Sequence, residues 1–292
     1  MPRRILAALV AALSLLALPA AAQAAKAKPS YYVSLGDSYA AGYQRFSATD
    51  ARTTRDGFAY QVVGKAKARG HKLKLVNFGC GGATTSSLLE RRTECPGKAL
   101  GGPDYTGRTQ IAAAQRFLRA HRGKVDLITV SIGGNDVTAC VRAADPIACV
   151  ATAVRRIEQN VTRTAKRLRK AAGRKPRIVG ITYPDVILGQ WVGVDADQEL
   201  AKLSVVAFKN LINPALRKAY AAGRGKLVDV TAATGAYGPL EETTTLEPYG
   251  VIPVPVARAC ELSFYCEFRD IHARTAGYKL IAELIVKTLP RR

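Results

Sequence analysis

Residues 31–39 read YYVSLGDSY, a short run of aromatic and aliphatic residues followed directly by a glycine, an acid and a serine. The run 31–35 has the length and composition of a buried strand. A strand that turns tightly into a helix exposes the next side chain at the carboxyl edge of a parallel sheet, close to free backbone N–H groups. We therefore predict that Ser38 presents a reactive hydroxyl there, although Gly36-Asp37-Ser38-Tyr39 alone is also ordinary turn sequence.

Strand-like and helix-like segments alternate along the rest of the chain. This alternation predicts a mainly parallel sheet with helices on both faces, that is, a three-layer α/β/α sandwich with five central strands. The fourth helix should be kinked or split where Asn213-Pro214 supplies a cap and a first-turn proline. The expected strands are 31–35, 73–76, 127–131, 177–181 and 226–230, and the expected helices are 57–69, 109–121, 147–172, 196–222 and 275–289.

The first 24 residues have the three parts of a secretory signal peptide. Arg3 and Arg4 precede an apolar run at 5–18, and Ala22-Gln23-Ala24 offers a small-residue cleavage site. The apolar run is shorter than the roughly 20 residues of a membrane span. The arginine pair also raises a twin-arginine signal, so the export route stays open. We expect a secreted, extracellular or periplasmic protein whose residues 25–292 form one catalytic domain.

The six cysteines follow an export signal and are even in number, which favours disulfides. Six cysteines permit 15 pairings, but they fall in three close couples, and loop closure favours near neighbours. The spacings do not suit a zinc site. We predict disulfides between Cys80 and Cys95, Cys140 and Cys149, and Cys260 and Cys266.

The chain is strongly basic, with a formal net charge of +22, or +20 without the two arginines of the leader. Such a surface attracts anionic lipid or acidic envelope polymers. The cations are nevertheless spread over helix faces, as in 147–172, and no nucleic-acid motif accompanies them. We expect a monomer with peripheral contact to anionic surfaces and no specific nucleic-acid partner.

Four segments with polar side chains stand at the ends of predicted strands or before the last helix. Ser38 follows the first strand, residues 77–85 follow the second, and Gly133-Gly134-Asn135-Asp136 follows the third; Asp270-Ile271-His272 precedes the final helix. Because the carboxyl ends of parallel strands meet at one edge, these segments should converge on a single site.

In these blocks and their order, nearly the whole chain after the leader resembles the secreted bacterial SGNH hydrolases, also called the GDSL esterase and lipase family. The resemblance implies a flavodoxin-like α/β/α fold and a serine nucleophile matched by Ser38. It also implies a general base matched by His272, and an oxyanion hole formed by the Ser38 N–H, Gly82 and Asn135. Asp136 and Asp37 are expected to brace their loops.

The chemistry of the residues agrees with this resemblance. A serine hydroxyl needs a neighbouring base, and of the three histidines, His71 and His121 lie in basic segments that suggest solvent exposure. Family members commonly carry an aspartate three positions before the histidine, but that position here is Arg269. Either Asp270 reaches the imidazole through altered backbone geometry, or a main-chain carbonyl near Arg269 orients the ring of a Ser-His dyad, which we slightly favour.

The expected reaction is hydrolysis of carboxylic esters through an acyl-enzyme, without a metal or other cofactor. Residues 185–191 and 236–260 should border the site, and their aromatic and apolar content suits an acyl pocket. We therefore predict a lipase or carboxylesterase acting on lipid or small-molecule esters. A carbohydrate O-acetylesterase is the catalytic alternative, and a non-catalytic cationic protein that binds acidic envelope polymers is the alternative from another class.

Overall fold

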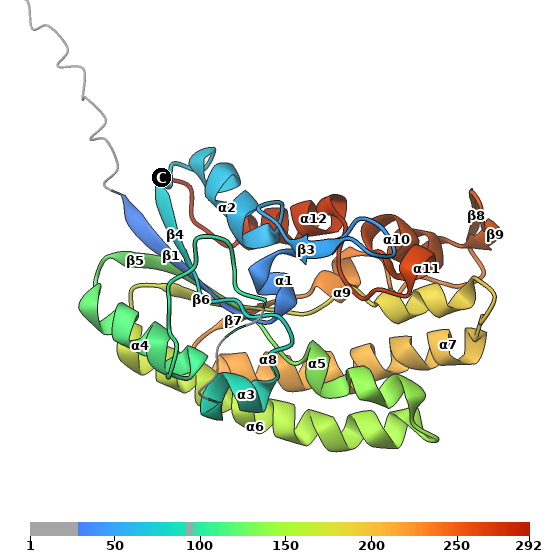
Figure 1. Ribbon diagram of the computed structural model, residues 1–292, viewed down its shortest axis with the longest axis horizontal. Helices are drawn as coiled ribbons and strands as arrows, with labels where there is room; N and C mark the ends of the chain where they lie inside the picture. Colours follow the sequence, from blue (N-terminus) through green and yellow to red (C-terminus); the bar gives the residue numbers. More distant parts are fainter. Residues whose placement is uncertain (1–28, 92–94, 96) are drawn as a thin grey trace, which may run out of the picture.

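Five parallel strands form the centre of the molecule, in the order β4-β1-β5-β6-β7 (Figure 1). The structure is a computed structural model that describes residues 29–91, 95 and 97–292; the predicted leader lies outside these residues. The predicted five-stranded α/β fold is therefore confirmed, with every strand pair of this sheet parallel. The strands are β1 (Ser30–Gly36), β4 (Leu73–Asn77), β5 (Val125–Ser131), β6 (Arg177–Ile181) and β7 (Lys226–Val228).

Strand β1 lies next to the point where the strand order of the sheet reverses. It pairs with β4 on one side and with β5 on the other, so the direction of winding reverses next to it. In open parallel sheets, ligands bind in the crevice at the carboxyl ends of the strands flanking such a reversal. The fold therefore places the end of β1, and Ser38 after it, where a binding site is expected.

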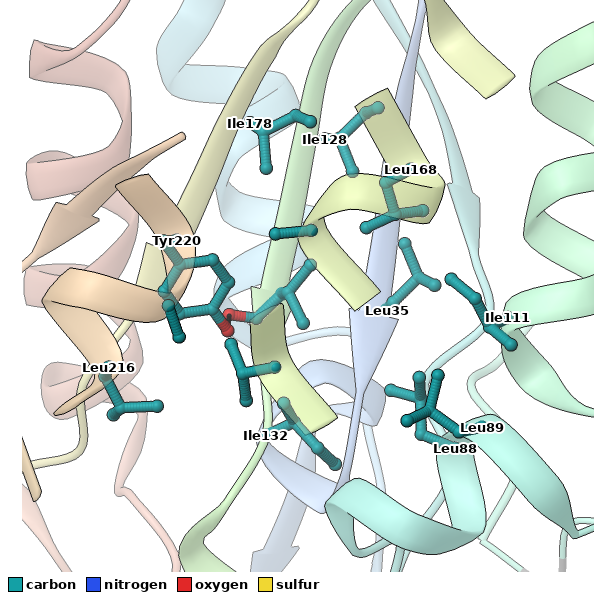
Figure 2. Packing of buried hydrophobic residues seen from close by; sticks show 14 of the residues in the cluster. Leu35, Leu88, Leu89, Ile111, Ile128, Ile132, Leu168, Ile178, Leu216 and Tyr220 are labelled. Atoms are coloured by element: carbon teal, nitrogen blue, oxygen red, sulfur yellow. Dashed lines mark hydrogen bonds between the residues drawn. The ribbon is translucent and has the colours of Figure 1, made fainter. Parts of the chain in front are cut away.

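Helices cover both faces of the sheet because alternate strand residues point to opposite sides. Val33 and Leu35 of β1 pack into one apolar core, which Figure 2 shows with Leu168 and Tyr220 from the covering helices, whereas Tyr32 packs into the other. The first face carries α4 (Gln110–Ala120), α6 (Pro146–Ala172) and α8 (Asn213–Ala222), and the second carries α2 (Phe58–Lys67) and α12 (Thr275–Lys287).

The predicted fourth helix is interrupted, as expected, but not by a cap. A π-helical turn, Phe208–Ile212, joins α7 (Gln198–Ala207) to α8. Asn213 keeps helical backbone angles and makes no capping bond; its side-chain amide instead donates to Thr231 Oγ1 at 2.9 Å. Pro214 has no N–H to donate to the carbonyl four residues earlier, and that carbonyl lies within the π turn.

Shorter elements that the sequence patterns missed complete the chain. Two hairpins have too few residues per strand for a clear alternation of side chains. These elements are α1 (Ser38–Ala41), the hairpin β2 (Tyr43–Arg45) with β3 (Ala51–Thr53), α3 (Thr85–Glu90), α5 (Gly134–Val137), α9 (Val230–Ala233), the hairpin β8 (Thr243–Leu246) with β9 (Gly250–Pro253), α10 (Val254–Leu262), α11 (Tyr265–Phe268) and the 3₁₀ helices η1 (Thr138–Arg142) and η2 (Val186–Trp191).

The three predicted disulfides are all present, with Cα–Cα distances of 5.5, 5.5 and 5.2 Å in chain order.

The sequence predicts that His71 is exposed, and this prediction is wrong. The side chain is 1 % exposed, and its Nε2 lies 2.8 Å from the carbonyl oxygen of Pro290, near the end of the chain. Within residues 29–91, 95 and 97–292, helices that combine the length and the apolarity of a membrane span are absent.

Candidate active site

Ser38 is the first residue of α1, and one residue separates it from the end of β1. The chain turns here through Gly36, whose φ is 134° and where a Cβ would lie 1.9 Å from the Ser131 carbonyl oxygen of the neighbouring strand. Asp37 caps α1 by accepting a hydrogen bond from the Tyr39 N–H at 3.0 Å. The turn therefore requires glycine at position 36, is capped by Asp37, and fixes the Ser38 hydroxyl at the end of the sheet.

Ser38, His272 and Asp270 form one chain of contacts. Ser38 Oγ lies 2.8 Å from His272 Nε2, and His272 Nδ1 lies 2.6 Å from Asp270 Oδ1. The structure thus brings together the three residues predicted from the sequence. The group at Nδ1 is the Asp270 carboxylate, which corresponds to the first of the two arrangements considered above and not to the favoured main-chain carbonyl.

Asp270 reaches the imidazole from only two positions away in the chain. Asp270 Oδ1 accepts a second hydrogen bond from the His272 backbone N–H at 2.9 Å. One carboxylate oxygen therefore faces both the backbone and the ring of His272.

The second oxygen of Asp270 binds Arg45, whose Nε lies 2.8 Å from Oδ2. Burial raises the pKa of Asp270, but the hydrogen bonds and charges of His272 and Arg45 outweigh it and hold that pKa well below its usual range. Asp270 therefore remains a carboxylate at any pH at which the protein would work.

Two aromatic residues enclose the His272 segment. The Tyr39 hydroxyl donates to the Ile271 carbonyl at 2.6 Å, and the Tyr43 ring centroid lies 4.5 Å from that of His272. Since Tyr39 follows Ser38 directly, its hydrogen bond joins the serine turn to the histidine loop.

Asn135 comes from the segment after β5, where it lies in the short helix α5, and Gly82 comes from the loop after β4; the two segments lie on either side of β1. Asn135 Nδ2 donates to the Ala83 carbonyl at 2.9 Å, so the two loops are joined next to Gly82. Gly82 has φ of 73°, which favours glycine. Asn135 and Ser38 line the same cavity. An amide carries two N–H donors, and one of those on Asn135 is left for a bound group.

The two acids expected to brace loops are both in contact with neighbouring groups. Asp136 accepts hydrogen bonds from Thr85 N and Oγ1 at 2.9 and 2.6 Å. Asp37 is buried and binds the Tyr183 hydroxyl. Burial raises the pKa of Asp37 to about 6, and hydrogen bonds from Tyr183 and the Tyr39 N–H limit the rise.

A cavity of about 890 Å³ extends from Ser38 between two walls. One wall comes from α5, η1 and the start of α6, and the other from η2, α7 and the π turn. Most of its lining is apolar, whereas Arg142, Gln190, Asp195, Asp197 and Arg269 are its main polar members. The apolar lining includes Val137, Ile147, Val150, Ile187, Leu200, Leu203, Phe208 and Ile212.

The sequence predicted only part of this cavity. Tyr183 and residues of η2 line it, as expected, but the segment 236–260 does not. That segment instead forms the hairpin β8–β9 and helix α10 and packs into a separate small core with Leu188. Of the walls that were missed, α7 carries apolar residues at helical spacing, but these resemble an ordinary core-facing pattern.

Asp185 is a buried acid beside the cavity that sequence reasoning left unassigned. Its Oδ2 accepts a hydrogen bond from Ser204 Oγ at 2.9 Å, while its Oδ1 is buried without a hydrogen-bond partner among the described residues. Burial raises the pKa of Asp185 to about 7, although Ser204 and the N–H groups of Ile187 and Leu188 lower it. In the part of the chain that the structure describes, groups of three or more His, Cys, Asp or Glu suited to a metal ion are absent.

Known proteins resemble this chain in sequence and in fold. The family described as GDSL-like lipase/acylhydrolase matches residues 32–285. Phospholipase A1 from Streptomyces albidoflavus NA297 is similar in structure, with a TM-score of 0.55 and 19 % identity over 89 % of this chain and 99 % of that one. The extracellular lipase of Streptomyces rimosus gives a TM-score of 0.51 and 17 % identity over 89 % and 100 %. None of the curated protein sequences compared with the chain matches it significantly.

Proposed function

Because the chain belongs to the GDSL-like lipase/acylhydrolase family, we propose that it is a secreted serine hydrolase of carboxylic esters that acts through an acyl-enzyme. The observation that carries the proposal is the contact chain from Ser38 Oγ through His272 to Asp270, at 2.8 and 2.6 Å. A hydroxyl becomes a useful nucleophile when an adjacent base removes its proton and a third group orients that base.

In the first half of the reaction, His272 Nε2 takes the Ser38 proton while Oγ bonds to the ester carbonyl carbon. Asp270 keeps the remaining ring proton on Nδ1 and stabilises the imidazolium that forms. The tetrahedral intermediate then collapses, and the alcohol leaves with the proton that His272 returns. In the second half, water gives a proton to His272 while its oxygen bonds to the acyl carbon. The bond between the acyl carbon and Oγ then breaks, and His272 returns the proton to Ser38 Oγ as the acid leaves.

The negative oxygen of the intermediate needs fixed donors. The Ser38 N–H lies at the start of α1, Gly82 offers a backbone N–H without a side chain in the way, and Asn135 offers its second amide hydrogen. Such donors act most strongly on the charge that develops in the transition state, and removing one typically costs about 10²–10³ in turnover.

The cavity next to Ser38 favours esters of apolar acids. Its volume of about 890 Å³ and its largely apolar lining would exclude water from an acyl chain. We therefore place lipid and acylglycerol esters first. An acetylated carbohydrate would use little of this cavity.

Purified protein without residues 1–24 should release p-nitrophenol from p-nitrophenyl esters and react covalently with a serine-directed phosphonate. Ser38→Ala should do neither. Ser86→Ala is the matched control, because the Ser86 hydroxyl contacts Asn160 and lies outside the cavity. Equal ester hydrolysis by the wild type and Ser38→Ala would overturn the proposal, and salt-sensitive binding of an anionic polymer by both would favour the binding protein. Esters of increasing chain length, tested beside acetylated xylan, separate a lipase from a sugar esterase.

Secretion is part of the same proposal. The three disulfides support it, because disulfides persist mainly in oxidising compartments outside the cytosol. Mass spectrometry of the protein exported by an expressing bacterium should give a mature chain that begins after Ala24. An unprocessed chain that stays in the cytosol would contradict the proposed secretion.

A further inference from the structure

We propose that Arg45 is a positioning residue for the reaction: its guanidinium holds the Asp270 carboxylate in the orientation that fixes the His272 ring. The inference rests on the proposed function, because it concerns the same site. It assigns a role to the hairpin β2–β3, which sequence patterns did not identify.

The carboxylate needs an external partner because its own backbone gives it little support. Asp270 Oδ1 is already shared between the backbone N–H and Nδ1 of His272, both in the same short loop. Its side chain is 8 % exposed, so without Arg45 the charge on Oδ2 would face a largely dry environment. An unpaired, poorly hydrated carboxylate oxygen favours rotation toward water, and that rotation would withdraw Oδ1 from the imidazole.

Arg45 is itself held in place by hydrogen bonds, so it can keep the Asp270 carboxylate in one orientation. Its Nε contacts Asp270, while Nη1 donates to the carbonyls of Ser47 and Ala48 at 3.3 and 3.0 Å in the hairpin turn. Its side chain is 26 % exposed. The planar guanidinium therefore has a defined plane and direction, which the flexible ammonium of lysine would not reproduce.

The hairpin has other attachments, to the helix α12 that follows the histidine loop, so it stays in place when the ion pair is removed. The Tyr278 hydroxyl of α12 donates to the Tyr43 carbonyl at 2.7 Å, and Gln44 Nε2 donates to Thr275 Oγ1 at 3.1 Å. Arg45→Met keeps most of the side-chain stem. It should therefore remove the contact with Asp270 without displacing β2.

A double-mutant cycle tests whether Arg45 acts through Asp270. Arg45→Met should lower kcat about 10–100-fold with KM nearly unchanged, the range found for groups that orient a functional histidine in metal sites. In the Asp270→Ala background the same change should alter kcat less than about twofold. Arg45→Lys should recover only part of the loss. The control is Arg52→Met, which removes an exposed arginine of β3 that pairs with Asp50; it should leave kcat and KM unchanged. An equal loss in both backgrounds would overturn the proposal.

A spectroscopic signature provides a readout that does not depend on turnover. The proton between His272 Nδ1 and Asp270 should give a strongly downfield ¹H resonance that Arg45→Met shifts or broadens and Arg52→Met preserves. An unchanged resonance in Arg45→Met would overturn the positioning role even in an inactive protein. The Ser38→Ala control separates the two failures: if it abolishes activity while Arg45→Met has no effect on kcat or on the resonance, the proposed function stands and only the role of Arg45 fails.

Discussion

Ser38 Oγ and His272 Nε2 lie 2.8 Å apart although 234 positions separate them in the chain. The strand β1 fixes the first residue and the start of α12 fixes the second. The hydrogen bond from Tyr39 to the Ile271 carbonyl joins the two segments directly. The distance is therefore set by the packing of two well-anchored elements, and both side chains are held before any substrate binds.

Replacing Asp270 measures the value of the carboxylate at His272 Nδ1. We expect Asp270→Ala to lower kcat about 10³–10⁴-fold, because the ring loses the group that fixes its tautomer and orientation. Steady-state kinetics on a p-nitrophenyl ester gives this value, with Glu267→Ala, an exposed acid paired with Arg274, as the control. A loss below about tenfold would mean that a main-chain carbonyl suffices and that the enzyme works as a dyad.

Asn135→Ala tests the proposed oxyanion donor. The side-chain amide should act mainly on the transition state, so kcat should fall about 10²–10³-fold while KM changes little. Asn210→Ala, an exposed asparagine in the π turn, is the control and should match the wild type. If Asn135→Ala instead raised KM and left kcat unchanged, the residue would bind the substrate without stabilising the intermediate.

The sequence predicted the sheet and the meeting of the four loops because both follow from local patterns. Alternating strands and helices constrain the topology, and parallel strands bring their carboxyl ends to one edge. The position of Ser38 after β1 and of Asn135 after β5 is a direct consequence. The sequence separations within the cysteine couples likewise indicated the disulfides, since short loops close most easily.

What the sequence missed depends on contacts between distant segments. Arg45 meets Asp270 across 225 positions, and His71 is buried by Pro290 near the other end of the chain. The cavity wall from α7 follows from how that helix packs against η2.

Asp185 should make stability depend on pH between about 4 and 7. Its pKa is raised to about 7 in the folded protein, against about 3.9 in an unfolded chain. Within this window the folded state binds more protons than the unfolded state, so the free energy of unfolding falls as the pH rises. Asp185→Asn removes this titration, so above pH 7 it should be more stable than the wild type by about 1–4 kcal/mol.

Urea unfolding of both proteins at a series of pH values measures this difference. The advantage of Asp185→Asn should shrink toward zero near pH 4, where the wild-type carboxyl is protonated in the folded state. Asp195→Asn, at an exposed acid in the loop after η2, is the matched control for replacing a carboxylate by an amide at the surface. An advantage that stayed constant across the pH range would mean that packing, not ionisation, explains the effect.

Filling the cavity should change the chain length that the enzyme prefers. Leu203 of α7 is half-buried and lines the apolar cavity, so a tryptophan there would occupy space meant for the far end of an acyl chain. We expect Leu203→Trp to lower kcat/KM for long-chain p-nitrophenyl esters at least tenfold and to leave the acetate ester within about threefold, since each buried methylene contributes about 0.8 kcal/mol. Val206→Trp, on the same helix but 45 % exposed and outside the cavity, is the matched control. Equal losses for short and long esters would show that acyl chains do not bind along this wall.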